Sequence, residues 1–261
     1  MKVSSIENLE QLIAYLLGAP PTSVRRFLSA RNCEWESLTR KAIASLGRGE
    51  PLSYALGGIY FRNRWIASDR RACAVRPYCE LFVQKALECA LPLTPHVLEM
   101  GCGAGAMIIS IALELSQGEF LAVDIDRDAL NLSRENASRL GASVTFVESD
   151  LFDKVKGHFD LIVASLPYEQ HPRGDTKINF EPQTAIYDGS SNRLGLMKRF
   201  LKGCCSALLP SGHVVIDTPE WVEQVTTIHG QPIFLPPDNE LIGFVMSAPE
   251  VLATIQNWNS D

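Results

Sequence analysis

Two loop motifs near the middle of the chain carry residue types that suit chemistry at a bound small molecule. The first motif, Glu99-Met100-Gly101-Cys102-Gly103-Ala104-Gly105, follows a predicted buried strand and precedes a predicted helix. Glycines are needed where a backbone turns sharply and approaches a ligand without a Cβ in the way. A turn of this kind suits nicotinamide dinucleotides, flavins and S-adenosylmethionine alike, so by itself it predicts only a nucleotide-like cofactor.

Acidic residues at the ends of the next two predicted strands narrow the choice of cofactor. Asp124 lies 23 residues beyond Gly101, where its carboxylate can accept both ribose hydroxyls, and Asp150 can meet an adenine amino group. The glycine spacing also departs from the G-x-G-x-x-G fingerprint of dinucleotide enzymes. Either acid alone could merely cap a loop, but the series on successive strand ends favours S-adenosylmethionine. The predicted cofactor-binding residues are Glu99, Gly101, Cys102, Gly103, Gly105, Asp124, Ile125, Asp150, Leu151 and Ser165.

The second motif, Ser165-Leu166-Pro167-Tyr168, ends the fourth predicted strand. In this motif the chain resembles the HemK/PrmC family of protein-(glutamine-N5) methyltransferases, which carries Asn-Pro-Pro-Tyr or a close variant at this place. Three further segments share the resemblance, which spans residues 6–220: Pro51-Leu52-Ser53-Tyr54, Arg76-Pro77-Tyr78-Cys79-Glu80 and Asn179-Phe180-Glu181-Pro182. The resemblance implies methyl transfer from S-adenosylmethionine to nitrogen, and a helical N-terminal module that helps to hold a protein substrate.

The family also implies how the second motif holds its methyl acceptor. The family's Asn side chain and the following backbone carbonyl accept the two N–H bonds of a carboxamide and so orient its nitrogen, which is catalysis by positioning. The residues that this implies for the acceptor side are Ser165, Pro167, Tyr168 and Glu169. Ser165 replaces the family's Asn with a single shorter hydroxyl, which we expect to rotate freely, and Cys79 replaces its Thr.

These departures lead to an expectation about the acceptor. A carboxamide placed against a freely rotating serine hydroxyl would leave one polar group poorly paired, at a cost of about 1–3 kcal/mol if buried. We therefore expect a basic small molecule or peptide side chain attracted by Glu169, or the release-factor glutamine with weak activity only. The alternatives are release-factor glutamine methylation proper, N- or O-methylation in specialised metabolism, and a non-catalytic relative that binds the cofactor.

Alternating helix and strand patterns provide the frame for both motifs. Predicted strands cover 97–100, 120–123, 144–147, 161–164 and 213–217, and predicted helices cover 81–91, 106–115, 128–140 and 194–209. This alternation is typical of a doubly wound, mostly parallel α/β sheet that binds ligands at the carboxyl ends of its strands. We predict a Rossmann-like class I methyltransferase domain over 76–261, behind a helical domain over 1–50 and a linking β-hairpin over 51–75.

Composition restricts the partners and the compartment. A formal net charge of −6 argues against general binding to nucleic acid or anionic membranes, and the five arginines between 62 and 76 are expected to form a solvated face. No apolar run reaches the roughly 18 residues of a membrane span. Seven cysteines without a C-x-x-C pair predict a reducing cytoplasm, and the histidines lack ligand spacing, so no metal site is expected.

Overall fold

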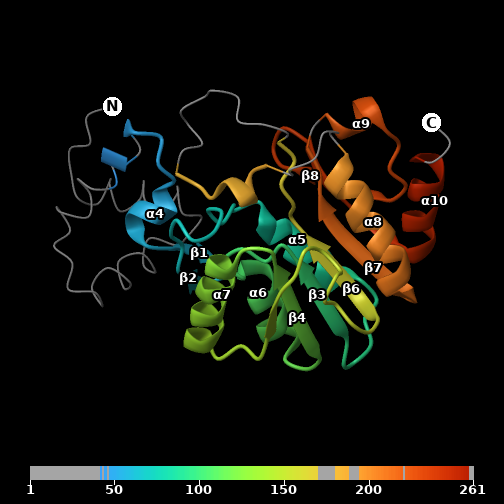
Figure 1. The fold of residues 1–261 in the computed structure, drawn as a ribbon, viewed down its shortest axis with the longest axis horizontal. Coiled ribbons are helices and arrows are strands. Elements are labelled where there is room, and N and C mark those ends of the chain that lie inside the picture. The colour runs from blue at the N-terminus through green and yellow to red at the C-terminus, as the bar shows by residue number, and fades with distance from the viewer. Residues whose placement is uncertain are drawn as a thin grey trace.

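One seven-stranded sheet organises the protein. The computed structural model describes residues 42, 44–45, 47–169, 180–187, 194–219 and 221–258, so most of the predicted helical domain lies outside the described residues. The strand order is β5-β4-β3-β6-β7-β9-β8, and a separate two-stranded hairpin precedes the sheet (Figure 1). The strands from β5 to β7 run parallel, whereas β9 pairs antiparallel with both β7 and β8. The predicted α/β class and mostly parallel sheet are therefore confirmed.

Between residues 79 and 217 helices and strands alternate as the sequence predicts. The strands of the sheet are β3 (His96–Met100), β4 (Glu119–Asp124), β5 (Thr145–Glu148), β6 (Phe159–Ala164), β7 (Leu208–Asp217), β8 (Gln231–Leu235) and β9 (Glu240–Ser247). The helices are α4 (Leu52–Leu56), α5 (Cys79–Glu88), α6 (Ala106–Leu115), α7 (Arg127–Leu140), α8 (Gly195–Ala207), α9 (Val222–Val225) and α10 (Ala248–Trp258). None of the helices described is long and apolar enough to cross a membrane.

Apolar side chains on the two faces of the sheet form two cores. Successive residues of a strand point to opposite faces, so Val97 of β3 packs with α5, α6 and α7, whereas Leu98 packs with α8 and α10. Both positions are fully buried because helices cover this parallel sheet on both sides. The strand ends, which no helix covers, are therefore the part of the sheet available to ligands.

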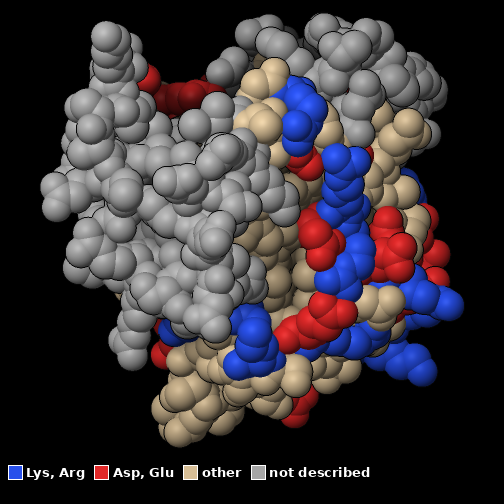
Figure 2. Space-filling model, turned by 90° about the vertical axis from the view of Figure 1, so that its left-hand side faces the viewer, with Lys and Arg blue, Asp and Glu red and all other residues tan. Residues whose placement is uncertain are grey.

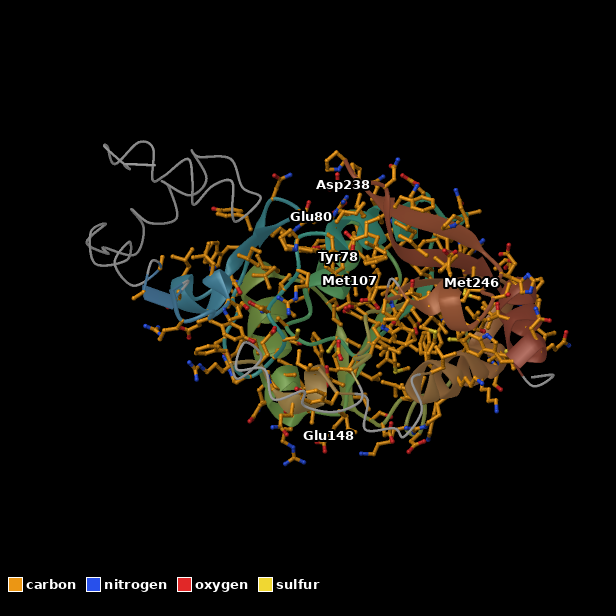
Figure 3. All side chains as sticks on the ribbon, turned by 90° about the horizontal axis from the view of Figure 1, so that it is seen from above. Tyr78, Glu80, Met107, Glu148, Asp238 and Met246 are labelled. Carbon is orange, nitrogen blue, oxygen red and sulfur yellow. The ribbon has the colours of Figure 1, made fainter. Side chains whose placement is uncertain are left out.

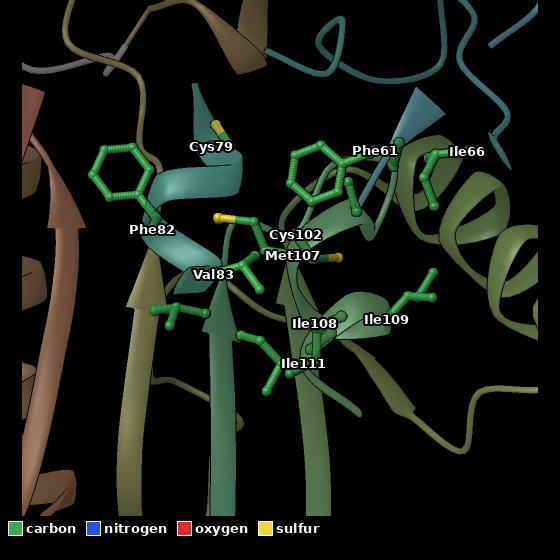
Figure 4. Packing of buried hydrophobic residues seen from close by; sticks show 14 of the residues in the cluster. Phe61, Ile66, Cys79, Phe82, Val83, Cys102, Met107, Ile108, Ile109 and Ile111 are labelled. Atoms are coloured by element: carbon green, nitrogen blue, oxygen red, sulfur yellow. The ribbon is translucent and has the colours of Figure 1, made fainter. Parts of the chain in front are cut away.

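The hairpin consists of β1 (Ile59–Phe61) and β2 (Arg64–Ile66). It belongs to the core on the face of the sheet that α5, α6 and α7 cover. Phe61 and Ile66 are fully buried in the same cluster as Phe82 of α5 and Ile109 of α6 (Figure 4). Its two turn residues have left-handed φ angles of 44° and 61°, the geometry that matches the twist of paired strands. The hairpin is thus packed onto the helices that flank the glycine-rich turn.

Two parts of the fold differ from the sequence expectation. The segment expected to be a hairpin begins with the short helix α4, because Gly57, at φ 74°, ends that helix just before β1. Beyond Trp221, where no motif is recognisable, β8 and β9 add an antiparallel edge to the sheet. Antiparallel strands need no crossover helix, so the alternating signal that marks the other strands is missing there.

The clustered arginines lie opposite acidic side chains. Arg62 and Arg64 both pair with Glu114, at 2.5 and 2.9 Å, and Arg71 pairs with Glu135 at 2.7 Å. Basic and acidic side chains are accordingly interspersed on the side of the molecule that carries α4 (Figure 2). Since each of these three arginines has an acidic partner, they do not form a concentrated positive charge on the described part of this surface.

Asn136 of α7 ties the hairpin to the glycine-rich turn. Its side chain is fully buried, and its Oδ1 accepts a hydrogen bond from the Ala67 backbone N–H at 2.9 Å. Its Nδ2 donates to the carbonyl oxygens of Ala67 and Ala104, both at 3.0 Å. One side chain thereby satisfies backbone groups of two separate loops, which would be costly to bury unpaired.

We predict that Asn136→Ala lowers the free energy of unfolding by about 2–4 kcal/mol, because it leaves buried backbone groups without a partner. Urea unfolding followed by circular dichroism measures the change. Asn131→Ala, on the exposed side of the same helix, is the control and should shift stability by less than about 0.5 kcal/mol. Equal stabilities of the two variants would contradict the prediction.

Candidate active site

The glycine-rich turn leaves the end of β3 in a conformation that side chains disfavour. Gly101, Gly103 and Gly105 have φ angles of 71°, 53° and 77°, all in the left-handed region. The carbonyl oxygen of Val123, at the end of β4, accepts the backbone N–H groups of Gly101 and Cys102 at 2.9 and 3.0 Å. The turn is therefore anchored to the neighbouring strand.

Two side chains hold this turn and the helix that follows it. Glu99 is 1% exposed, and its Oε2 accepts the Ile108 backbone N–H at 3.0 Å, in the first turn of α6. Burial raises the pKa of the Glu99 carboxyl well above its ordinary value. From α7, the Ser133 hydroxyl donates to the Gly103 carbonyl oxygen at 2.6 Å. Glu99 and Ser133 thus fix the turn from its buried side. Cys102 is buried beside Ser133.

Asp124 is brought against the glycine turn, as its place at the end of β4 suggested. Its Oδ2 accepts the Gly103 N–H at 2.8 Å, and its Oδ1 accepts the Asp126 N–H at 2.9 Å. Burial raises the pKa of this carboxyl, which remains half-buried at the strand end. The next side chain, Ile125, is 56% exposed. The turn and this acidic residue therefore form one edge at the ends of β3 and β4.

Asp150 and Leu151 lie beyond the end of β5. Asp150 pairs with Arg199 of α8, with 2.9 Å between Oδ2 and Nη2, and both side chains are partly exposed. Leu151 has a left-handed φ of 46°, which turns the chain away from the strand direction. These two predicted cofactor residues are thus at the same sheet edge, but Asp150 already has a cationic partner.

The second motif lies directly against the first. A Cβ on Gly101 would come within 3.3 Å of Leu166 Cδ2 and 3.6 Å of the Ser165 carbonyl oxygen. The contact follows from topology, because β3 and β6 are parallel neighbours and Met100 is in register with Ala164. The predicted cofactor turn and the predicted acceptor loop therefore leave adjacent strands at the point where the strand order reverses.

Asp217, at the end of β7, is the residue of this site that sequence reasoning missed. Its Oδ2 accepts the Ser165 hydroxyl at 2.7 Å, and its Oδ1 accepts the Leu166 N–H at 3.2 Å and the Tyr168 hydroxyl at 2.9 Å. Burial raises its pKa to about 6, while the hydrogen bonds from Ser165 and Tyr168 act in the opposite direction. The available signal was an acidic residue ending a predicted strand, the same signal that singled out Asp124.

This arrangement corrects the expectation that the Ser165 hydroxyl rotates freely. The hydroxyl is held by a buried carboxylate, and Tyr168 is fixed by the same group. A serine hydroxyl has only one hydrogen, so the Oγ that donates to Asp217 can only accept from any other partner. The expectation of free rotation is therefore wrong, whereas the shorter reach of a serine side chain is unchanged.

Two further segments of the family resemblance meet beside the acceptor loop. Arg76 and Glu181 form an ion pair, with 2.8 Å between Nη2 and Oε2, and Glu181 is the more buried partner. The backbone N–H of Glu169, whose side chain is exposed, donates to the Ile186 carbonyl oxygen at 3.2 Å. These contacts place 180–187 next to the loop, whereas Asn179 lies outside the described residues.

Comparison with known proteins agrees with this geometry. A family model described as a methyltransferase domain matches residues 94–254. The release factor glutamine methyltransferase of Bordetella pertussis is 34% identical over 71% of this chain and 69% of that protein. The enzyme of the same name from Deinococcus radiodurans is 31% identical over 70% of this chain and 65% of that protein. The chain therefore spans about two thirds of the length of these two relatives.

A solved structure shares the fold. The T. thermophilus 16S rRNA N2 G1207 methyltransferase, solved with AdoMet and guanosine, superposes with a TM-score of 0.51 at 16% identity, over 73% of this chain and 49% of that one. Sheet order, glycine turn and family match together define an S-adenosylmethionine-dependent methyltransferase of the Rossmann-like class. Within that class, the chain belongs to the HemK/PrmC family.

The raised pKa of Asp217 predicts a pH-dependent stability. A carboxyl whose pKa is about 6 when folded and about 4 when unfolded binds more protons in the folded state between these values. It therefore favours folding at low pH, and this contribution is lost as the pH rises through 6. The unfolding free energy of the wild type relative to Asp217→Asn should fall by about 2–3 kcal/mol from pH 4 to pH 7.

Urea unfolding of both proteins across this pH range provides the measurement. Because the variant retains Glu99 and Asp124, whose pKa values are also raised by burial, the difference between the two curves isolates Asp217. A difference that does not change with pH would show that this carboxyl titrates as it does in the unfolded chain.

Proposed function

We propose that this enzyme transfers the methyl group of S-adenosylmethionine to a primary nitrogen, with the glutamine side chain of a protein as its first candidate acceptor. The closeness of the glycine turn to the Ser165–Tyr168 loop supports the proposal, because a cofactor held at the turn would lie next to an acceptor held at the loop. The names of the two relatives, release factor glutamine methyltransferases, support the acceptor class. A translation protein as acceptor also fits a cytoplasmic enzyme.

The cofactor would lie along the edge formed by β3, β4 and β5. Among the described residues, a Cβ added to Gly103 would meet only Ala72, at 4.0 Å, so this part of the structure leaves room for a ligand to approach the backbone closely. The Asp124 carboxylate would accept ribose hydroxyls, Ile125 would pack on the adenine ring, and Asp150 would meet the adenine amino group. Glu99 and Cys102 are buried, so their part is to hold the turn. When bound, the cofactor supplies an electrophilic methyl group.

The acceptor nitrogen would be held by Ser165 Oγ and the Leu166 carbonyl oxygen. An amide nitrogen is a poor nucleophile, because its lone pair is delocalised into its carbonyl group. Two acceptors that bind its hydrogens orient the nitrogen toward the methyl group, and orientation of this kind contributes several kcal/mol to catalysis. Pro167 restricts the loop, and Tyr168, tied to Asp217, would line the acceptor side with its ring.

A basic amine is the second candidate acceptor. The observation that favours it is the pair of acidic residues at the loop, the buried Asp217 beneath Ser165 and the exposed Glu169 at its end. Negative charge attracts a cationic amine, and Glu169 would accept the proton that such an amine must lose before it attacks. A carboxamide is neutral before it attacks and releases its proton only as or after its nitrogen takes the methyl group, so only the amine needs a proton acceptor such as Glu169 before the attack.

We predict that the protein binds S-adenosylmethionine and S-adenosylhomocysteine with low-micromolar or tighter dissociation constants. Asp124→Ala should weaken binding roughly tenfold to over a hundredfold, because it removes hydrogen bonds from ribose to a charged group. Isothermal titration calorimetry tests both statements, with Asp128→Ala on the exposed face of α7 as the control. An absence of heat with either ligand would exclude the cofactor site proposed for this edge.

The acceptor is tested by methyl transfer from labelled S-adenosylmethionine to two kinds of substrate. We expect transfer to a release-factor fragment that contains Gly-Gly-Gln, and none when Gln is replaced by Glu. If a panel of free amines and amino acids is methylated instead, and Glu169→Gln lowers that rate at least tenfold, the amine candidate is correct. Transfer to neither substrate class would rule out both candidates.

A further inference from the structure

We propose that Asp217 is a positioning residue which, together with Ser165, performs the task of the single asparagine in the family's Asn-Pro-Pro-Tyr motif. The inference rests on the proposed function, since it concerns how the acceptor nitrogen is held. It assigns a role to a residue outside the motif, on a different strand. The Asp217 carboxylate binds the hydroxyl hydrogen of Ser165. The Ser165 oxygen therefore presents only lone pairs to the nitrogen that accepts the methyl group, as the carbonyl oxygen of an asparagine side chain does.

The carboxylate is itself immobilised, which makes this assignment specific. Asp217 is 7% exposed, its Oδ1 accepts the Leu166 N–H, and the single hydrogen of the Tyr168 hydroxyl is shared between Oδ1, at 2.9 Å, and the Asp217 backbone carbonyl oxygen, at 2.5 Å. Oδ2 is thus directed at Ser165, whose hydroxyl donates to it at 2.7 Å. On the other side, β9 presents Gly243 opposite Asp217, where an added Cβ would come within 3.0 Å of the Asp217 Cα. Close strand packing thus fixes the backbone of Asp217, and the hydrogen bonds from Ser165 and the Leu166 N–H direct its carboxylate toward the Ser165–Tyr168 loop.

The direction of the Ser165 hydrogen depends on the charge of Asp217. An ionised carboxylate can only accept, so the hydroxyl hydrogen must point at it. A protonated carboxyl, or an amide in its place, can donate to Ser165 Oγ. The hydroxyl hydrogen then turns toward the acceptor nitrogen, where it competes with the N–H group that the oxygen should bind. Loss of the negative charge therefore converts Ser165 from an acceptor into a donor.

Three described groups on which the Asp217 charge acts keep their own charge constant near the same pH. The side chains that face it are Tyr168 in the acceptor loop, and Tyr78 and Cys79 at the start of α5. Burial first, and then the Asp217 charge, raise the pKa of each of these groups above its ordinary value, so all three stay neutral around pH 6. Figure 3 labels Tyr78 between Glu80 and Met107, whereas Glu148 is labelled at the lower margin of the view.

The test is a set of variants assayed with the Gly-Gly-Gln fragment and S-adenosylmethionine: Asp217→Asn, Ser165→Asn and both together. Asp217→Asn should lower kcat/KM about ten- to a hundredfold. In the Ser165→Asn background the same change should alter kcat/KM by less than about threefold, because the carbonyl oxygen of the introduced asparagine accepts the N–H group whatever stands at 217. Cofactor affinity should stay within about twofold in Asp217→Asn, and Asp238→Asn, at an exposed turn, should change nothing.

The pH profile is the measurement that a merely structural role would not move. Wild-type kcat/KM should fall on the acid side of about pH 6, and this limb should be absent in the Ser165→Asn variant. An equal loss from Asp217→Asn in both backgrounds would overturn the proposal. Inactivity of Ser165→Asn, or the same acid limb in that variant, would also overturn it.

A titration without any acceptor separates this inference from the proposed function. The hydrogen bond from Ser165 lowers the pKa of Asp217, so Ser165→Ala should raise the carboxyl pKa measured by carbon-13 NMR above that of the wild type. An unchanged pKa would refute the Ser165–Asp217 link even if glutamine is methylated. A raised pKa together with no transfer to any acceptor would instead refute the proposed function alone.

Discussion

The parallel pairing of β3 with β6 is the constraint on which the arrangement of the site depends. These strands are neighbours although two helices and two strands separate them in the chain, and Met100 lies in register with Ala164. Their following loops must therefore leave the sheet side by side. A Cβ added to Gly101 would lie 3.3 Å from Leu166 Cδ2, so the two loops are separated by little more than the space of one methyl group. Without that pairing the two motifs would be unrelated segments of sequence.

Buried carboxyl groups hold the loops at this sheet edge. Glu99 accepts a backbone N–H from α6, Asp124 accepts one from the glycine turn, and Asp217 accepts one from the acceptor loop. A backbone N–H that leaves regular structure needs a partner if it is buried, and a carboxylate is a strong acceptor. Burial raises the pKa of all three carboxyls. At this edge, the loops are therefore fixed by carboxyl groups whose pKa values lie above the ordinary value.

The division of the sheet into two cores separates the roles of the surrounding helices. Helices α6 and α7, with the hairpin packed on them, support the glycine turn through Ser133 and Asn136. Helices α8 and α10 lie on the other face and pack beneath Leu166 of the acceptor loop. Changes on one face are therefore expected to act first on the glycine turn, and changes on the other face first on the loop that begins at Ser165.

The sequence by itself determined the local features of this protein. Glycine spacing, acids after buried strands and alternating patterns predicted the parallel sheet, the glycine turn and the place of Asp124, because each of these signals is contained in a few consecutive residues. The sequence did not predict the C-terminal strands β8 and β9, because their antiparallel pairing leaves no alternation of helix and strand.

Only the tertiary structure decided how Ser165 is used. Its hydroxyl is bound by Asp217, which lies 52 residues further along the chain and on another strand. The hydrogen-bonding capacity of a serine is set by the partner it meets, and no local pattern contains that partner. The sequence alone therefore showed a serine in the place of the family's asparagine, whereas the fold supplied the carboxylate that orients its hydroxyl.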